Sequence, residues 1–207
     1  MRVRCYHLFP ENTVLQLILL IICSYLLGSI PTGLLLAKSA GVDIRTTGSG
    51  NIGATNVYRT LGRSIGILTL VGDCLKGLIP VLVARWLGMG EVGIAVAGTA
   101  AFLGHVYTIF LRFKGGKGVA TALGVFLGAS PPSVGIAVII FIATVVARRY
   151  ISLGAIVAAG AIPFLITGLD RRPLVIAMSV VIAIIVIWRH RENISRMRAG
   201  TENKFKA

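Results

Sequence analysis

The sequence is poor in charged residues and poorest in carboxylates. Only 14% of its 207 residues are charged, and only seven are Asp or Glu. A soluble domain normally carries about a quarter of its residues as charges, so this composition favours a membrane protein over a soluble globule. The scarcity of carboxylates argues against a metal site built from Asp and Glu, and we expect neither a metal nor a cofactor.

Cysteine is also scarce. The three cysteines, Cys5, Cys23 and Cys74, contain no C-x-x-C pair. We therefore expect neither a disulfide framework nor a zinc site.

Apolar residues and glycine dominate the remainder. The chain is 56% hydrophobic, has a mean hydropathy of +0.87 and contains 25 glycines, which allow helices to pack closely in lipid. Its charges are unbalanced, because 21 Lys and Arg give a net charge of +14. In a membrane protein this excess indicates anionic partners, either lipid head groups or a phosphorylated substrate, and we do not expect a nucleic acid.

Apolar runs long enough to cross a membrane recur along the chain. A spanning helix needs roughly 20 apolar residues. Six runs qualify, at residues 14–37, 65–84, 92–111, 133–147, 150–169 and 173–188, and a shorter one covers 118–130. Although the first run follows Arg2 and Arg4 like a signal peptide, its length and the spans after it indicate a retained helix.

The positive charges favour seven spans over six. Seven spans with the N-terminus outside place fifteen Lys and Arg inside and five outside, whereas leaving 118–130 uncrossed gives nine against eleven. We therefore predict an all-α integral membrane protein with about seven transmembrane helices, one of them short, with its N-terminus outside and its C-terminus inside. Residues 1–207 would form a single domain, with a periplasmic leader (1–13), a transmembrane region (14–188) and a basic cytoplasmic tail (189–207).

A glycine-rich loop interrupts the apolar pattern after the first run. Gly48, Gly50 and Gly53 have the spacing of a dinucleotide-binding fingerprint, but that motif follows a strand, and here a membrane helix precedes it. Glycines nevertheless let backbone N–H groups converge on an oxyanion. The polar side chains available beside them are those of Ser49, Asn51, Thr55, Asn56 and Arg59. We expect a phosphate site here, and a purely structural loop is the alternative.

Residues 112–118 form a second candidate phosphate site. Lys114 and Lys117 flank Gly115 and Gly116 where an apolar helix begins, so that cations lie beside free N–H groups at a positive helix end. The spacing does not match a P-loop. Ordinary positive-inside charge would account for the lysines but not for the glycines.

A third polar segment is the basic tail. His190 and Asn193 are three residues apart and share one face of a continuing helix. Such a tail also anchors proteins to anionic lipid, which is the alternative interpretation.

Some polar residues lie within or beside the spans. Asp73 and Lys76 are three residues apart in the second run, which predicts a structural ion pair. We expect His105 to hydrogen-bond between helices, and Ser152 alone would be a helix cap. With seven spans, the two loops, the tail and Ser152 meet on the inner side and bring no carboxylate base among them.

Three motifs resemble those of a known family. GSGNIGATNVYRTLG (48–62), GHVYTIFLRFKGGKGVATALG (104–124) and RHRENISRMRAGTENK (189–204) look, in order and spacing, like the motifs of the bacterial acyl-phosphate-dependent glycerol-3-phosphate acyltransferases, the PlsY family. The resemblance extends from about residue 14 to 204. One departure is Thr108, where members usually carry proline, and it bears only on a helix kink there.

The resemblance implies an activity and a location. It implies transfer of a fatty acyl group from acyl phosphate, not acyl-CoA, to the 1-hydroxyl of sn-glycerol 3-phosphate. The products would be lysophosphatidic acid, for phospholipid synthesis, and inorganic phosphate. The enzyme would lie in the bacterial cytoplasmic (inner) membrane with its active site on the cytoplasmic side. A soluble enzyme would supply the acyl phosphate.

The resemblance also suggests roles for the polar residues. One phosphate would be held by the first loop, namely Ser49, Gly50, Asn51, Gly53, Thr55, Asn56 and Arg59. Lys114, Gly115, Gly116 and Lys117, with Ser152, would hold the other phosphate or stabilise developing charge. His190 and Asn193 would orient the acceptor hydroxyl. Its proton would pass either to His190 or to a phosphate oxygen of the donor.

Two other classes of membrane protein fit these features less well. A small organic-phosphate transporter could use glycine-rich broken helices, but such carriers often contain internal repeats, and the two halves of this chain show none. Membrane acyltransferases that use CoA thioesters usually contain an H-x-x-x-x-D pair. None of His7, His105 and His190 begins one.

Overall fold

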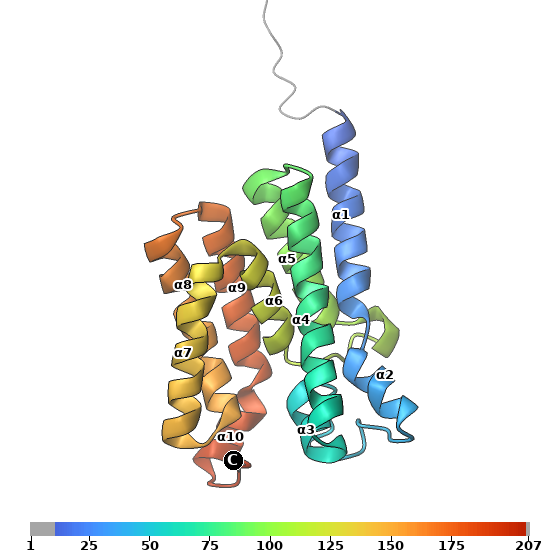
Figure 1. Ribbon diagram of the computed structural model, residues 1–207, viewed down its shortest axis with the longest axis vertical. Helices are drawn as coiled ribbons and strands as arrows, with labels where there is room; N and C mark the ends of the chain where they lie inside the picture. The colour runs from blue at the N-terminus through green and yellow to red at the C-terminus, as the bar shows by residue number, and fades with distance from the viewer. Residues whose placement is uncertain (1–10, 206–207) are drawn as a thin grey trace, which may run out of the picture.

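The computed structural model describes residues 11–205, and every regular element in that range is helical (Figure 1). The elements are α1 (Glu11–Ser29), α2 (Thr32–Ser39), α3 (Ala54–Leu61), α4 (Arg63–Trp86), α5 (Gly90–Val106), the 3₁₀ helix η1 (Ile109–Leu111), α6 (Val119–Ala129), α7 (Pro131–Arg148), α8 (Ile151–Leu169), α9 (Pro173–Arg189) and α10 (Arg191–Arg198). Residues 1–10 of the expected leader lie outside the described residues, and residues 11–13 already belong to α1.

Five segments of the described chain are long and apolar enough to cross a bilayer. They are Val14–Ser39, α4, Gly90–Leu111, α7 and α8, and α9 taken with α10 gives a sixth that bends by 49°. The all-helical membrane architecture is thus confirmed. The short predicted span corresponds to α6, whose 11 residues extend about 16 Å against a hydrocarbon layer of about 30 Å. A seventh crossing and the predicted orientation of the termini stay predictions.

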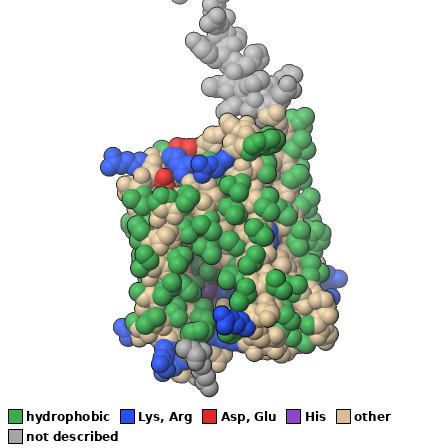
Figure 2. Space-filling model, in the orientation of Figure 1, with side chains coloured by type: hydrophobic (Ala, Val, Ile, Leu, Met, Phe, Trp, Pro, Cys, Tyr) green, Lys and Arg blue, Asp and Glu red, His purple; other side chains and the backbone are tan. Residues whose placement is uncertain are grey.

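Side-chain chemistry divides the surface as a bilayer requires. Figure 2 shows hydrophobic side chains over the middle of the face, with Lys and Arg gathered toward its two ends. Many large apolar side chains on the long helices are exposed, among them Leu15, Leu68 and Ile139. These side chains suit contact with lipid rather than with water.

The first span is broken, in contrast to the continuous helix that its hydropathy predicts. The break falls at Pro31, which has no N–H to donate and disfavours helical geometry in the residue before it. The carbonyls of Ser29 and Ile30 thereby leave the regular helical pattern. Thr108 Oγ1 donates to the Ser29 carbonyl over 2.6 Å, and Lys76 Nζ donates to the Ile30 carbonyl over 2.7 Å.

The chain reverses after α5 although Thr108 stands where a proline is usual in the resembling motif. The helix ends at Val106, and the next residues fold back as η1. Gly115 N and Gly116 N donate to the carbonyls of Val106 and His105 over 3.1 and 3.2 Å. The returning segment therefore lies directly against the end of α5.

The helices pack in two groups, with α6 between them (Figure 1). α1, α4 and α5 pack together on one side, α7, α8 and α9 on the other, and α5 and α6 contact members of both groups. Glycine permits the close crossing of α4 and α6, because a Cβ at Gly77 would overlap the Thr121 carbonyl and one at Gly124 the Cys74 carbonyl. The largest core cluster joins the two groups through side chains such as Phe102 and Ile182.

Two arginines fix the far end of α6. Arg85 Nη1 donates to the Gly128 carbonyl over 2.8 Å, and Arg172 Nη2 donates to the Ala129 carbonyl. Cations next to the last carbonyls satisfy them and interact favourably with the helix dipole. The other end of α6, at Val119, faces the site described next.

Candidate active site

A polar cavity and an apolar groove adjoin near the first turn of α6. The cavity has a volume of about 350 Å³ and the groove about 1070 Å³. Several residues line both spaces, including Thr55, Arg59, Val119 and Ala155. The two spaces therefore form one site with a polar part and an apolar part.

The polar cavity is lined by residues from all three polar segments. Of the predicted site residues, those lining it are Ser49, Asn51, Gly53, Thr55, Asn56, Arg59, Lys117, Ser152, His190 and Asn193, together with Asp73 from the predicted ion pair. Gly50, Lys114, Gly115 and Gly116 do not line it. Lys114 is exposed at the surface instead. The segments that were expected to meet do meet.

The side chain of Asn56 organises the first loop. Its Oδ1 accepts from Ser49 N over 2.9 Å, and its Nδ2 donates to the carbonyls of Thr47 and Asn51 over 3.0 and 2.9 Å. Gly48, with a φ of 60°, allows this close approach, because a Cβ there would overlap the Asn56 amide. The Asn56 side chain therefore uses its hydrogen bonds to hold the backbone of the loop in shape.

The start of α3 offers hydrogen-bond donors to the cavity. Ala54 and Thr55 occupy its first turn, where backbone N–H groups have no partner within the helix, and both residues line the cavity. Gly53 N is already taken by Asn51 Oδ1 over 2.9 Å. An anion here would meet a positive helix end beside the Arg59 guanidinium.

Gly115 and Gly116 shape the second polar segment, although they do not line the cavity themselves. Arg189 donates to their carbonyls over 2.8 and 3.3 Å. A Cβ at Gly116 would overlap the His105 imidazole, and one at Gly115 would overlap the His105 carbonyl. The glycines thus allow the chain to pass close to α5 and bring Lys117 to the cavity.

Lys117 is held inside the cavity. Its Nζ donates to Asn193 Oδ1 over 2.5 Å. Burial lowers the pKa of Lys117, and the positive charge of Arg196 lowers it further, while Glu202 acts in the opposite direction. The ammonium is thus a poorly solvated cation that an incoming anion would stabilise.

Glu202 contradicts the expectation that no carboxylate joins these segments. It accepts hydrogen bonds from Ser152 Oγ over 2.8 Å, Asn193 Nδ2 over 2.6 Å and Arg196 Nε over 2.7 Å. Burial alone would raise its pKa, but these hydrogen bonds outweigh burial and hold the pKa below its usual value. The carboxylate is thus ionised, and it ties α8 to the tail.

The chain brings Glu202 back to Asn193 by a turn after α10. Gly200, with a φ of 70°, follows the helix end and permits the reversal. The only sequence signal for this turn is that glycine, which does not by itself specify where the following carboxylate lies.

His190 is buried next to this cluster and is uncharged. Its Nδ1 lies 2.8 Å from the Val186 carbonyl, which can only accept, so Nδ1 carries the proton and Nε2 keeps a lone pair. Burial lowers the pKa of His190 to about 4. At neutral pH its Nε2 can accept a hydrogen bond from a ligand hydroxyl.

Asp73, Lys76 and His105 form a buried cluster behind the polar cavity. Lys76 Nζ lies 2.8 Å from Asp73 Oδ1, and His105 Nδ1 lies 3.7 Å from the same oxygen. Asp73 and His105 also line the cavity. Since Lys76 binds the Ile30 carbonyl as well, this cluster connects the break in the first span to the site. Within residues 11–205, no group of three or more His, Cys, Asp or Glu is arranged to hold a metal ion.

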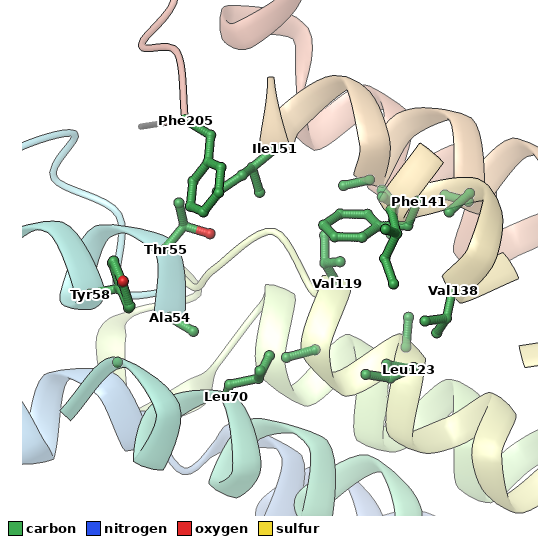
Figure 3. Close-up of a pocket in the computed structure, with 18 of the residues that line it drawn as sticks. Ala54, Thr55, Tyr58, Leu70, Val119, Leu123, Val138, Phe141, Ile151 and Phe205 are labelled. Carbon is green, nitrogen blue, oxygen red and sulfur yellow. The ribbon is translucent and has the colours of Figure 1, made fainter. Parts of the chain in front are cut away.

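The C-terminal tail covers one side of the mouth of the site. Phe205 N donates to the Arg149 carbonyl over 2.6 Å, and Arg59 Nη2 donates to the Asn203 carbonyl over 3.4 Å. Figure 3 shows Phe205 close to Thr55 and Ile151 at this end of the groove. The tail therefore contributes to both parts of the site.

The groove itself runs along α6, α7 and α8, with further residues from α4 and α9, and is lined mainly by aliphatic side chains. Figure 3 shows Val119 and Leu123 of α6 facing Phe141 and Val138 of α7, with Leu70 of α4 nearby. Figure 2 shows a hollow on this face with a histidine side chain visible inside it. A long apolar chain bound here could place a polar head in the cavity.

Comparisons with known proteins agree with this arrangement. The chain matches the family model for glycerol-3-phosphate acyltransferase over residues 18–200. A protein of that name from Geobacter metallireducens is 72% identical over 190 residues, which are 92% of this chain and 98% of the relative. One from Geotalea daltonii is 69% identical over 189 residues, which are 91% of this chain and 97% of the relative.

Two solved structures are similar over the same range. They are crystal structures of PlsY, an integral membrane glycerol 3-phosphate acyltransferase, in its glycerol 3-phosphate form and its lysophosphatidic acid form. Their TM-scores to this chain are 0.88 and 0.86. Both are 42% identical to this chain, and each match covers 92% of this chain and 96% of the other.

Proposed function

Because the chain belongs to the PlsY family of glycerol-3-phosphate acyltransferases, we propose that it transfers a fatty acyl group from acyl phosphate to the 1-hydroxyl of sn-glycerol 3-phosphate. The products are lysophosphatidic acid and inorganic phosphate. The observation that carries the proposal is the continuity of a cation-lined polar cavity with an apolar groove. Such a site suits one substrate that is a small phosphate and another that joins a phosphate to a long chain.

The charge of the cavity supports a phosphate donor. Two substrate phosphates must lie close together, and cations are required to offset their repulsion. Lys117, Arg59 and Arg196 line the cavity, and Glu202 cancels only part of their charge. A mixed anhydride is already activated, so its transfer needs no nucleophilic side chain.

The donor phosphate is assigned to the first loop. Thr55 and Arg59 line both the cavity and the groove, so they lie where the head of a groove-bound chain would be. Ser49 and the N–H groups at the start of α3 would complete its contacts. The second phosphate, on the acceptor, would be held by Lys117 with Ser152 and Arg196.

His190 and Asn193 are assigned to the acceptor hydroxyl. The hydroxyl oxygen attacks the acyl carbonyl carbon, the new C–O bond forms, and the bond between that carbon and the phosphate oxygen breaks. A group with a pKa of about 4 is a weak base, whereas the donor phosphate gains basicity as its bond to the acyl carbon breaks and its oxygen keeps the bonding electrons. His190 Nε2 therefore aligns the hydroxyl, and the proton passes to a phosphate oxygen of the donor.

The location is proposed on the same grounds as the topology. The cavity lies at the end of the molecule that the positive-inside rule assigns to the cytoplasm, so the enzyme would lie in the bacterial inner membrane and receive donor from a soluble acyl-phosphate-producing enzyme. Lys114→Cys in a cysteine-free background should react with an impermeant maleimide only after the inner membrane is permeabilised. Reaction in intact spheroplasts would overturn this orientation.

The activity can be tested with purified protein in detergent. Palmitoyl phosphate and glycerol 3-phosphate should yield phosphate and lysophosphatidic acid in equal amounts, and palmitoyl-CoA should not replace palmitoyl phosphate. Turnover with the CoA thioester alone would overturn the donor assignment. Uptake of glycerol 3-phosphate into sealed vesicles without acyl transfer would instead support a transporter.

A further inference from the structure

The apolar groove is lined by regular stripes of residues along its helices. On α8 the lining residues are Ile151, Ala155, Ala158, Ala159 and Ile162. Their spacing of three or four places them on one helix face. α6 and α7 contribute similar stripes. Position along each stripe therefore measures distance from the polar cavity.

The groove has a near end that is common to three helices. Ala120 on α6, Phe141 on α7 and Ala155 on α8 line both the cavity and the groove. Ile151, the first residue of α8, also lines both spaces, so the reactive head of a bound donor would lie level with Ile151, and its chain would pass Ala155 on the way down the groove.

The far end of the groove lies at about the same depth on all three helices. The last groove-lining residues in that direction are Phe126 on α6, Val134 on α7 and Ile162 on α8, each 4% exposed. Each lies six or seven residues from the shared residue of its own helix, which corresponds to about 10 Å. All three belong to the packed core. The groove therefore ends against a wall rather than continuing along the bundle.

The length of the groove matches a membrane lipid chain. From Ile151 to Ile162 it extends along α8 for about 16 Å. One leaflet of the hydrocarbon core is about 15 Å deep. A chain of the length found in bilayer lipids would thus reach the far wall.

Small side chains keep the deep part of the groove open. Ala159 lies four residues beyond the shared Ala155 and three before Ile162 at the wall. A larger side chain at this position would project into the space that the last methylenes of a long chain need, while leaving the near part of the groove free.

We propose that the groove measures the acyl chain, with residue 159 fixing the longest chain accepted and Ile162, Phe126 and Val134 forming the stop. This inference rests on the proposed function, since it assigns specificity within the same reaction. Each methylene that is excluded from the groove costs about fourfold in transition-state binding. The effect of a residue here therefore grows with chain length, unlike that of a residue in the polar cavity.

The test is turnover of an acyl phosphate series by Ala159→Phe in detergent. The kcat/KM for palmitoyl phosphate relative to that for decanoyl phosphate should fall by more than about tenfold, because several methylenes are displaced. The KM for glycerol 3-phosphate should stay unchanged, since Ala159 does not line the polar cavity. An unchanged ratio, or an equal loss with every chain length, would overturn the proposal.

Two further variants separate chain measurement from a packing defect. Val157→Phe places the same aromatic side chain on α8 at a 39% exposed position that does not line the groove, and its chain-length profile should match the wild type. Ile162→Ala should deepen the groove and raise the rate with arachidoyl phosphate relative to palmitoyl phosphate, a gain that misfolding cannot produce. A shift with Val157→Phe as large as that with Ala159→Phe, or no gain with Ile162→Ala, would contradict the proposal. Failure of the proposed function would show separately, as no turnover by the wild type with any chain length, and would overturn both.

Discussion

Lys117 Nζ donates to Asn193 Oδ1 over 2.5 Å, although the two residues are 76 positions apart. This hydrogen bond joins the second polar segment to the third inside the cavity. Glu202 then accepts from the amide nitrogen of the same Asn193. The cation, the amide and the carboxylate thus form one chain of hydrogen bonds whose geometry depends on every member.

Replacing Lys117 by Met should remove the buried cation while keeping the length of the side chain. We expect kcat/KM to fall about 10- to 100-fold, as when one charge-assisted contact to a substrate phosphate is lost. Initial rates of phosphate release measure this. Lys114→Met is the matched control, because Lys114 is exposed and lies outside the cavity lining, and its rate should change by less than about threefold. Equal losses in both variants would count against the role of Lys117.

Replacing Arg59 by Ala should weaken donor binding. One lost charge-assisted contact to phosphate costs about 1.5–3 kcal/mol, so the KM for acyl phosphate should rise about 10- to 100-fold. Arg63→Ala is the control, since Arg63 is an exposed residue at the start of α4 that lines neither space. Unchanged KM values for both substrates in Arg59→Ala would remove the phosphate assignment.

Protonation of His190 in the unfolded chain should make the free energy of unfolding depend on pH between 6.5 and 4. The folded enzyme keeps His190 neutral over most of that range, so its activity should not follow the same dependence. Because the folded pKa of His190, about 4, lies below the ordinary 6.5, the unfolded chain binds the proton first, and this contribution to stability declines as pH falls from 6.5 toward 4. Thermal unfolding at a series of pH values should show that slope, and His190→Gln should lack it.

The kinetics of His190→Ala test its catalytic role. We expect kcat to fall about tenfold, which is less than the 10²- to 10⁴-fold contribution of a general base. A loss within that range would make His190 the proton acceptor after all, and near-normal turnover would remove it from the reaction.

Glu202→Gln should destabilise the tail and the cavity together. The carboxylate satisfies three donors, and leaving buried donors poorly paired costs about 1–3 kcal/mol. Since the pKa of Glu202 is lowered, its contribution is present above the usual glutamate pKa and is lost as pH falls through the folded pKa. The wild type should therefore lose this contribution in acid, while the pH dependence of Glu202→Gln should be flatter. A variant as stable as the wild type at pH 7 would contradict this.

Thr108→Val should weaken the contact between the first and third spans. It removes the donor to the Ser29 carbonyl next to the Pro31 break, at a cost of about 1–3 kcal/mol in the free energy of unfolding. Denaturant unfolding in detergent measures the change. Thr144→Val is the control, because the Thr144 hydroxyl bonds only the Ile140 carbonyl of its own helix. The idea fails if the two variants lose the same stability.

Hydropathy and motif spacing predicted the helices and the meeting of the polar segments. Apolar runs determine spans because backbone groups in lipid must bond within the helix. The break at Pro31 was not predicted, although proline is a known helix breaker, because hydropathy alone continues through it. The distances between Lys76, Thr108 and the freed carbonyls depend on packing between spans that are distant in sequence.

The role of particular polar side chains was harder to predict. The amide of Asn56 could bind a ligand or the backbone equally well, and only the folded loop shows that it binds backbone. Glu202 reaches the site through a turn whose direction the sequence does not encode locally. The groove was missed for a different reason, because it is formed by small side chains such as Ala155 and Ala159, whose contribution is empty space.

The separation of the site into two spaces has an evolutionary consequence. Ala159 and Ile162 belong to the groove alone, and Lys117 and His190 belong to the cavity alone. Under the proposed function, substitutions in the first pair retune which fatty acids enter the lipids of the cell, and the transfer step is left intact. Lineages can then adjust membrane fluidity to a warmer or colder habitat one residue at a time, without an inactive ancestor in between.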